Sequence, residues 1–316
     1  MRIAKVAGYG FLALLWLGLV GRAFPVHAGG ITPPEPSTSL SNDDMNYHVY
    51  FPLIFNQPPY TFLVAGHTYG ATGVDNPGVH PPFKAWFPWI NEHHPRFGFF
   101  AGDTVIYGSK QNWDEVDADV ASLTFPIHFV VGNHDMTNRA LFVSRYGPTY
   151  YTFTHQCDLF IVLDSELDGG RITGEQLEFL QTALSHPPAR HIFILIHKLI
   201  WVADGTPYAV LRDDINGHTG YDFQGSFWED VMPLLRATNR KVYLIAGDVG
   251  VSWAMSLFYQ PDGNVRFIAT GMGGSEEENF LLFTVVGDKV YIHPQRLDGQ
   301  PLNHKTITAY NLSLYK

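Results

Sequence analysis

The chain has 316 residues, of which 46% are hydrophobic, so it is long enough to bury a large core within one domain. Asp and Glu (30) outnumber Lys and Arg (20), and the net charge of −10 excludes nucleic acid as a steady partner because like charges repel. Cys157 is the single cysteine, which excludes an internal disulfide, so stability must come from packing.

The first 28 residues have the three parts of a secretory signal peptide. Arg2 and Lys5 form a basic start, residues 11–20 are apolar, and small or apolar residues precede Gly29. The apolar stretch is short for a membrane span, so we expect cleavage and export to the periplasm, the cell surface or the exterior. The mature chain would carry no transmembrane segment and a net charge of −13, because three basic residues are lost. An uncleaved membrane anchor is the alternative.

The rest of the chain reads as a linker and one folded domain. Residues 29–46, which begin with a stretch rich in Pro, Ser and Thr, predict a flexible linker, and the domain is expected over residues 47–316. Strand-like apolar runs in it alternate with helical patterns at 113–123, 137–146, 174–184 and 227–237. This alternation favours α/β layers.

Two parts of the domain have clearer patterns. Leu177, Leu180 and Leu184 share one face of the predicted helix at 174–184, and Thr173 is its predicted N-cap. After Asp248 the helical patterns stop, and strands are predicted at 253–259, 265–270, 280–286 and 289–293. We expect these strands to form a β-rich layer of the same domain.

Several apolar runs end in a side chain that can bind a metal. The runs at 60–65, 99–101, 129–131, 192–196 and 242–246 are followed by Gly66-His67, Gly102-Asp103, Gly132-Asn133-His134-Asp135, His197 and Gly247-Asp248. The carboxyl ends of strands in an open α/β sheet are where ligands bind. We therefore expect His67, Asp103, Asn133, His197 and Asp248 to form a divalent-metal site.

Two loops belong near this site. Residues 202–224 have no sustained period and directly follow the predicted strand end at His197, so we expect a long loop that shapes the pocket. Residues 271–275, which include three glycines, predict a tight turn nearby, and the run of Glu276, Glu277 and Glu278 predicts a solvated surface.

In order and spacing, these segments resemble the motifs of the calcineurin-like metallophosphoesterase family, whose relatives include the purple acid phosphatases. The family pattern is Asp-x-His, Gly-Asp, Gly-Asn-His-(Asp/Glu), a lone His and Gly-His-x-His, each at a strand end. The resemblance spans residues 60–250. It implies an α/β fold with a sandwich of two mixed β-sheets flanked by helices, in four layers α/β/β/α, and a metal-dependent phosphoesterase.

The chain departs from the family pattern in its first and last motifs. His67 stands where the family has Asp, and Asp248 stands where it has His, so the total of two carboxylates is kept. Tyr69 and Gly250 replace two other family ligands. The resemblance then implies one well-held ion, bound by the second-metal ligands Asp103, Asn133, His197 and Asp248. The first site would keep His67 and the bridging Asp103, with a Tyr69 phenolate as a further ligand if the ion is ferric-like, and would be weak or empty.

The sequence leaves the metal open among Mn, Fe, Zn and Mg. Purple acid phosphatases have a tyrosine ligand three residues after the bridging aspartate, whereas Tyr107 lies four residues after Asp103. A continuing strand would turn Tyr107 to the other face, so we expect it to pack in the core.

By resemblance, His134 would protonate the leaving oxygen of a phosphomonoester or phosphodiester, and Asp135 would orient His134. The expected substrate is a small-molecule, glycan or lipid phosphate. Because two ligands are lost, a non-catalytic protein that binds a glycan or phosphate on the same scaffold is the alternative.

Overall fold

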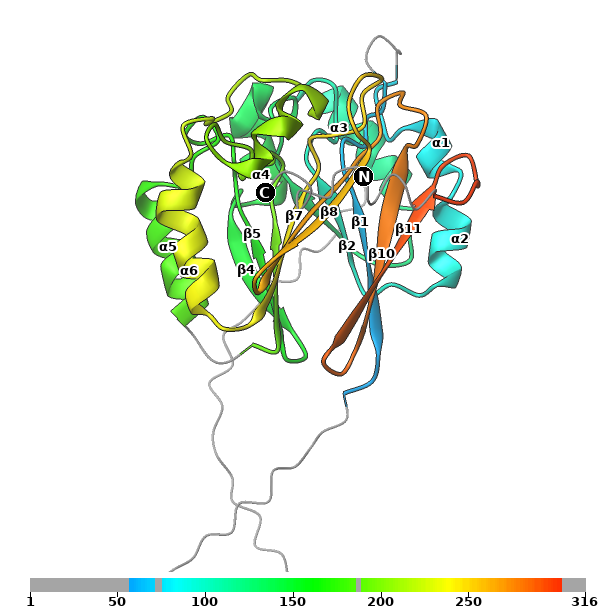
Figure 1. Ribbon diagram of the computed structural model, residues 1–316. Coiled ribbons are helices and arrows are strands. Elements are labelled where there is room, and N and C mark those ends of the chain that lie inside the picture. Colours follow the sequence, from blue (N-terminus) through cyan, green and yellow to red (C-terminus); the bar gives the residue numbers. More distant parts are fainter. Residues whose placement is uncertain (1–56, 72–75, 186–188, 303–316) are drawn as a thin grey trace, which may run out of the picture. The chain divides into compact units, whose positions relative to one another are not determined.

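The computed structural model describes residues 57–71, 76–185 and 189–302 (Figure 1). The predicted signal peptide and linker lie outside these residues, as do both ends of the predicted domain. Within the described part of the chain, no helix is long and apolar enough to cross a membrane.

The first of two sheets combines the start and the end of the domain. Its strands lie in the order β11, β10, β1, β2, β3. They span Tyr60–Ala65 (β1), Gly98–Ala101 (β2), Ile127–Val130 (β3), Asn279–Val286 (β10) and Lys289–Arg296 (β11). The pairs β1–β2 and β2–β3 are parallel, whereas β1–β10 and β10–β11 are antiparallel, so this sheet is mixed.

The second sheet is also mixed, with strands in the order β4, β5, β6, β7, β9, β8. They span Tyr151–His155 (β4), Asp158–Val162 (β5), His191–Leu195 (β6), Lys241–Ala246 (β7), Leu257–Asp262 (β8) and Val265–Thr270 (β9). Its central strands are parallel, and β4 and β8 are antiparallel edge strands.

Helices cover the outer face of each sheet (Figure 1). The α-helices are α1 (Pro81–Lys84), α2 (Phe87–Glu92), α3 (Lys110–Val120), α4 (Arg139–Tyr146), α5 (Gly174–Ser185) and α6 (Met232–Ala237). Two 3-10 helices, η1 (Asp135–Asn138) and η2 (Pro207–Asp214), and a π-helix, η3 (Phe227–Val231), lie between them. Helices α1 to α4 pack on the first sheet, and α5 and α6 pack on the second.

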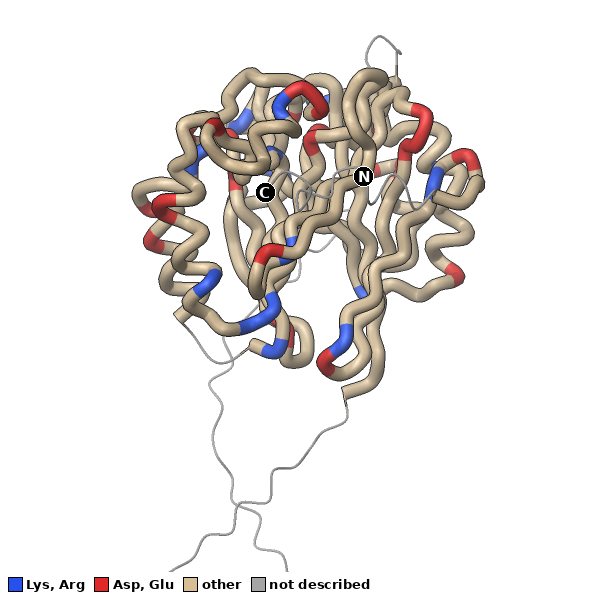
Figure 2. The backbone as a smooth tube through the Cα atoms, in the orientation of Figure 1, with Lys and Arg blue, Asp and Glu red and all other residues tan. Residues whose placement is uncertain are grey.

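Alternation along the strands produces separate apolar layers. Phe62 and Val64 of β1 belong to the layer between the sheets, whereas Leu63 and Ala65 pack outward against the helices. A third layer fills the space between the second sheet and α5 and α6. Figure 2 shows the strands largely free of charged residues, as expected for sheets buried on both faces. The predicted four-layer α/β/β/α sandwich of two mixed sheets is therefore confirmed.

A buried polar cluster joins the two sheets at the amino ends of their parallel strands. The Tyr60 hydroxyl at the start of β1 donates to Asp158 Oδ2 at the start of β5, at 2.7 Å. Arg190 Nη2 and the ring of His191 also bond this carboxylate, at 2.5 and 2.9 Å. Asp158 is fully buried, so the cluster ties the first sheet to the second.

The structure corrects several sequence expectations about elements. The strands after Asp248 complete both sheets instead of forming one layer. The hairpin β4–β5 and the short helices α1 and α2 had not been predicted. Leu180 is buried in α5 and Leu177 packs beside it, as predicted, but the Thr173 hydroxyl donates to Asp168 at 2.6 Å instead of capping the helix.

Candidate metal centre

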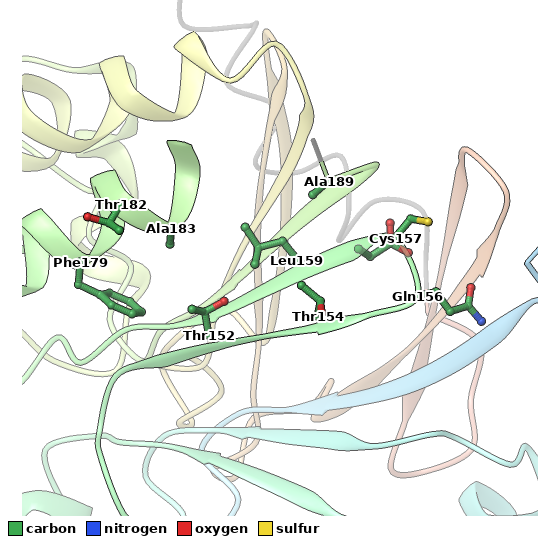
Figure 3. A pocket seen from close by; sticks show the side chains of 10 residues that line it. Thr152, Thr154, Gln156, Cys157, Leu159, Phe179, Thr182, Ala183 and Ala189 are labelled. Atoms are coloured by element: carbon green, nitrogen blue, oxygen red, sulfur yellow. The ribbon is translucent and has the colours of Figure 1, made fainter. Parts of the chain in front are cut away.

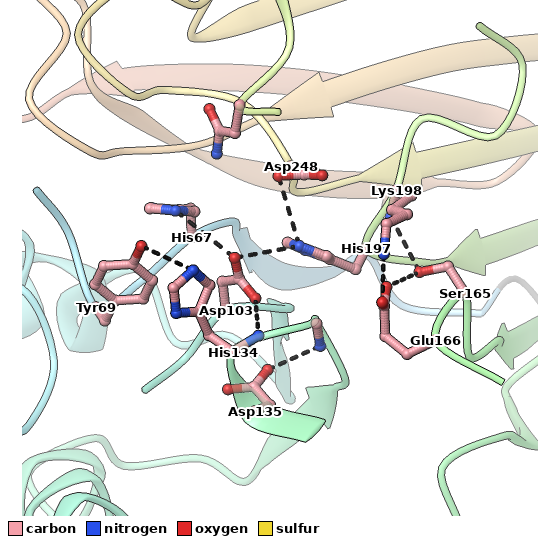
Figure 4. A network of polar contacts seen from close by, with 12 residues as sticks. His67, Tyr69, Asp103, His134, Asp135, Ser165, Glu166, His197, Lys198 and Asp248 are labelled. Carbon is pink, nitrogen blue, oxygen red and sulfur yellow. Dashed lines mark hydrogen bonds and ion pairs between the residues drawn. The ribbon is translucent and has the colours of Figure 1, made fainter. Parts of the chain in front are cut away.

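The candidate centre lies where strands of both sheets end. His67 and Asp103 follow β1 and β2 of the first sheet, and His197 and Asp248 follow β6 and β7 of the second. Figure 4 shows these four side chains pointing toward one another. The centre therefore bridges the carboxyl ends of the two sheets, as the strand-end pattern had suggested.

Glycines at the strand ends allow the two sheets to approach closely. A Cβ atom at Gly247 would lie 2.0 Å from the carbonyl oxygen of Ala101, and one at Gly66 would lie 2.1 Å from that of Thr270. Both contacts cross from one sheet to the other, and any larger residue would push the sheets apart. This explains why Gly precedes His67 and Asp248.

The backbone at two site residues is strained. His67 and Asp103 have φ values of 53° and 52°, in the left-handed region that favours glycine. Such a conformation costs about 1–3 kcal/mol per residue and persists where the surrounding structure enforces it. A hydrogen bond of 3.0 Å from His67 N to Gly102 O helps to hold this turn.

Asp103, His197 and Asp248 form a compact buried group. One potential ligand atom of each lies within 4.8 Å of the others. His197 Nε2 is 3.4 Å from Asp103 Oδ2 and 3.6 Å from Asp248 Oδ1. His197 Nδ1 donates to Ala101 O at 3.1 Å, which turns Nε2 toward both carboxylates. Nε2 is buried and has no hydrogen-bond partner among the described residues.

The other two predicted ligands, His67 and Asn133, line the same cavity as Asp103 and Asp248. His67 is buried, and its Nε2 atom is 3.7 Å from Asp103 Oδ2. Asn133 is exposed and lines the same cavity of about 200 Å³. The cavity is bordered by His67, Tyr69, Asp103, Asn133, His134, Asn216, Gly217, Thr219, Asp248, Val251 and Trp253.

The electrostatics of the group favour a cation at its centre. Burial lowers the pKa of His197, but the carboxylates of Asp103 and Asp248 outweigh burial and raise it to about 10. Burial raises the pKa of Asp103, but His197 and His67 outweigh it and hold this pKa well below its usual range. At neutral pH and without a metal, His197 therefore carries a proton between the two carboxylates. A divalent ion would replace this proton, and the imidazole and two carboxylates are donors that suit such an ion. These residues therefore fit the ion that the sequence predicts.

His134 borders the cavity, but it is oriented differently from the prediction. Its Nδ1 atom bonds the carbonyl oxygen of Ile106 at 2.8 Å, and its backbone N–H donates to Asp103 Oδ1 at 3.0 Å. Its Nε2 atom lies 3.5 Å from the Tyr69 hydroxyl, on the side of the metal group. Ile106 therefore takes the orienting role that had been expected of Asp135.

The expectation that Asp135 orients the His134 ring is wrong. The Asp135 carboxylate accepts bonds from the backbone N–H groups of Thr104, Val105 and Gly132, at 2.9, 3.0 and 2.9 Å. It thus links the turn after β2 to the turn after β3. Burial and the neighbouring charge of Asp103 raise the pKa of Asp135 to about 7.

Other expectations near the site have mixed outcomes. Tyr107 is 63% exposed, so its expected core packing is wrong. In the predicted turn at 271–275, the backbone N–H groups of Gly273 and Gly274 donate to Glu278 Oε1, at 2.8 and 2.7 Å. Glu278 is therefore partly buried rather than solvated.

Three residues of the site were missed by the sequence analysis. Tyr221 donates a 2.8 Å hydrogen bond to Asp248, while Asn216 and Trp253 line the cavity. Tyr221 and Asn216 belong to the loop 202–224, for which a role in the pocket was predicted without any residue being singled out. No motif marks these residues, because their position depends on how the loop folds back over β7.

A larger cavity, of about 610 Å³, lies away from the metal group (Figure 3). It is bordered by β4, β5 and α5 and is mostly apolar. Asp158 is the only charged residue among the described residues that line it, and its carboxylate is bonded to Tyr60, Arg190 and His191. The chemistry therefore concentrates in the smaller cavity.

The arrangement of layers and strand ends is shared with solved structures. A purple acid phosphatase from seeds of yellow lupin (Lupinus luteus) superposes with a TM-score of 0.57 at 14% sequence identity, over 78% of this chain and 53% of that one. The chain has the calcineurin-like metallophosphoesterase fold. It spans about half the length of this purple acid phosphatase.

Two smaller proteins were also found by this structural comparison. A conserved uncharacterized protein of Streptococcus pneumoniae, described as a predicted phosphoesterase, has a TM-score of 0.37 at 11% identity, over 78% of this chain and 94% of that one. Vps29 of Entamoeba histolytica, complexed with zinc, has a TM-score of 0.34 at 11% identity, over 75% of this chain and 99% of that one. A scan against protein-family models and a search of curated proteins each give no match.

Proposed function

We propose that this protein is a metal-dependent phosphoesterase that hydrolyses a phosphomonoester or phosphodiester after export. The observation that carries the proposal is the buried, unpaired Nε2 of His197, which faces the carboxylates of Asp103 and Asp248. Two carboxylates and an imidazole placed in this way are costly to bury unless a cation joins them. The export part of the proposal rests on the pattern of residues 1–28.

Asp103, His197 and Asp248 would hold the ion, with Asn133 and His67 as further donors. When bound, a divalent ion neutralises the charge of a phosphate ester and activates water for attack. The protein's part is to hold these ligands on the ends of rigid strands. One well-held ion is proposed, among Mn, Fe, Zn and Mg, with a second site weak or absent.

His134 would act as the general acid. Ile106 O accepts a hydrogen bond from Nδ1, so a proton on Nε2 is directed toward the cavity and the Tyr69 hydroxyl. From there His134 can transfer this proton to the oxygen of the departing alcohol. Asp135 contributes indirectly, because it fixes the turn that carries His134.

The substrate is proposed to be a small-molecule, glycan or lipid phosphate with an apolar or cyclic leaving group. Trp253 lines the cavity and is 62% exposed, so its ring is free to stack on such a group. The cavity of about 200 Å³ accommodates the phosphoryl group and leaves the remainder of the ester at its mouth.

Hydrolysis of β-glycerophosphate with added Mn²⁺, measured by phosphate release, tests the proposal, because its alkoxide leaving group departs only when it is protonated. We expect turnover by the wild type and a loss of about 10²–10⁴-fold in kcat for His134→Ala, since a general acid contributes that much. The matched control is His293→Ala, because His293 is exposed on β11. Both variants should bind metal as the wild type does.

Equal kcat values for the wild type and the His134→Ala variant would contradict the role of His134. A metal-loaded wild type that binds phosphate or a glycan without turning any ester over would instead support the non-catalytic binding protein. The replacement of family ligands by Tyr69 and Gly250 is the observation that favours this second candidate.

A further inference from the structure

Tyr221 lies in the loop after β6 and is fixed on several sides. Its hydroxyl donates to Asp248 Oδ2 at 2.8 Å and accepts a longer hydrogen bond of 3.4 Å from Leu199 N. Lys198 Nζ lies 5.8 Å from the centre of its ring, and the ring of Phe223 stacks nearly parallel to it, with centroids 5.4 Å apart. The phenol therefore has little freedom to move away from Asp248.

The two carboxylate oxygens of Asp248 face different neighbours. Oδ2 is held by the Tyr221 hydroxyl, and Oδ1 lies 3.6 Å from His197 Nε2. A carboxylate rotates readily about its last torsion when nothing holds it, so the bond to Oδ2 decides which oxygen faces the metal group. The hydrogen bond from Tyr221 to Oδ2 thus fixes the orientation of the Asp248 carboxylate.

The same loop also holds the backbone around Asp248. Asn216 N donates to the carbonyl oxygen of Asp248 at 3.2 Å, and Asn216 Oδ1 accepts a bond of 3.0 Å from Val251 N. Asp248 is thereby fixed at both its side chain and its main chain by residues of one loop. This support falls on a residue where the chain departs from the family motif.

We propose that Tyr221 is a positioning residue of the metal centre, which orients the Asp248 carboxylate so that Oδ1 faces Asp103 and His197, where the ion would be held. The inference rests on the proposed function, since it requires a metal at Asp103, His197 and Asp248. Residues that orient metal ligands in this way contribute about 10–100-fold to metal affinity.

The test compares the wild type with Tyr221→Phe and Tyr208→Phe. Tyr208 lies in the same loop, and its hydroxyl bonds Asp262 at 3.4 Å at the end of β8, so it is a matched control away from the centre. Mn²⁺ affinity is measured by calorimetry, and the ligand geometry is read from the visible spectrum of the Co²⁺-loaded protein. The melting temperature without metal is measured for all three proteins.

We expect Tyr221→Phe to weaken Mn²⁺ binding by about 10–100-fold and to alter the Co²⁺ spectrum, while Tyr208→Phe does neither. Without metal, both variants should melt within about 4 °C of each other, because each loses one hydrogen bond. Replacing Tyr221 by 4-aminophenylalanine, which keeps a donor at the same place, should restore the affinity. In an Asp248→Ala background, Tyr221→Phe should have no further effect on affinity.

Three results would overturn the inference. If the wild type binds Mn²⁺ and Tyr221→Phe binds it equally well, Tyr221 does not position Asp248, although the proposed function stands. If Tyr221→Phe does not fold without metal while Tyr208→Phe does, the hydroxyl is a structural element of the loop. If the wild type binds no metal, the proposed function fails, and the inference fails with it.

Discussion

An imidazole and a carboxylate have exchanged places in this centre relative to the family motifs. His67 stands at the end of the first strand and Asp248 at the end of β7, and Asp248 Oδ1 lies 3.6 Å from His197 Nε2. The number of carboxylates is kept, and so is the negative charge that attracts a cation. The exchange therefore alters the position of each donor but preserves the charge of the group.

Tyr69 is expected to act through its hydroxyl and not as a phenolate ligand. Burial, followed by the charges of Asp103 and Asp248, raises its pKa, and its hydroxyl lies 3.5 Å from His134 Nε2. Tyr69→Phe should keep the metal affinity and lower kcat about fivefold, since one hydrogen bond of about 1 kcal/mol is lost. The Fe³⁺-loaded wild type should show no visible band from a tyrosinate ligand. A band that disappears in Tyr69→Phe but persists in Tyr208→Phe would contradict this.

The sequence predicted which residues end the strands, because each follows an apolar run and a glycine. It could not predict which side chains bond each other across the turns. Asp135 adjoins His134 in the chain, yet its carboxylate bonds backbone N–H groups while the Ile106 carbonyl orients His134. Such partners depend on backbone direction in short turns, which residue spacing does not fix. Tyr221 was missed for the same reason.

Strands were easier to predict than the short elements between them. The strands β1, β6 and β7 are mainly apolar because nearly all of their residues are buried on both faces. Helices α1 and α2 have 4 and 6 residues, too few to display a helical period. The edge strand β4 alternates half-buried and exposed residues, a pattern that is readable but weaker.

The cluster around Asp158 makes the free energy of unfolding depend on pH in the acid range. Burial raises the pKa of this carboxyl, but hydrogen bonds from His191, Arg190 and Tyr60 outweigh burial and lower the pKa from 3.8 to about 2. The unfolded chain then takes up the proton at a higher pH than the folded protein does. The stabilisation is therefore fully present above about pH 4 and is lost as the pH falls toward 2.

Asp158→Asn should reduce the free energy of unfolding at pH 7 by about 3 kcal/mol, because Arg190 and His191 lose a charged partner. Urea unfolding is measured from pH 7 to pH 2. The difference in the free energy of unfolding between the wild type and Asp158→Asn should become smaller below about pH 4. Asp213→Asn, at an exposed position of η2, is the control and should follow the wild type. A gap that stays constant down to pH 2 would contradict the assigned role of Asp158.

In the whole molecule, two polar groups connect the sheets at opposite ends of their strands. The Asp158 cluster joins the starts of β1, β5 and β6, and the candidate metal centre joins the ends of β1, β2, β6 and β7. Between them lies the apolar layer shared by both sheets. The fold could be predicted at this scale because the motifs follow one another in the order of the family and each marks the end of a strand. The sequence could not assign the last four strands to the two sheets, because that assignment depends on pairing between strands far apart in the chain.

Metal content of the purified protein, by elemental analysis after dialysis against Mn²⁺ and then against metal-free buffer, tests the central claim most directly. We expect about one ion per chain in the wild type and loss of that ion in Asp103→Asn, which removes a central charged ligand. Two retained ions would show that the first site is intact after all. A wild type that retains no metal would contradict the account of Asp103, His197 and Asp248 as a metal centre.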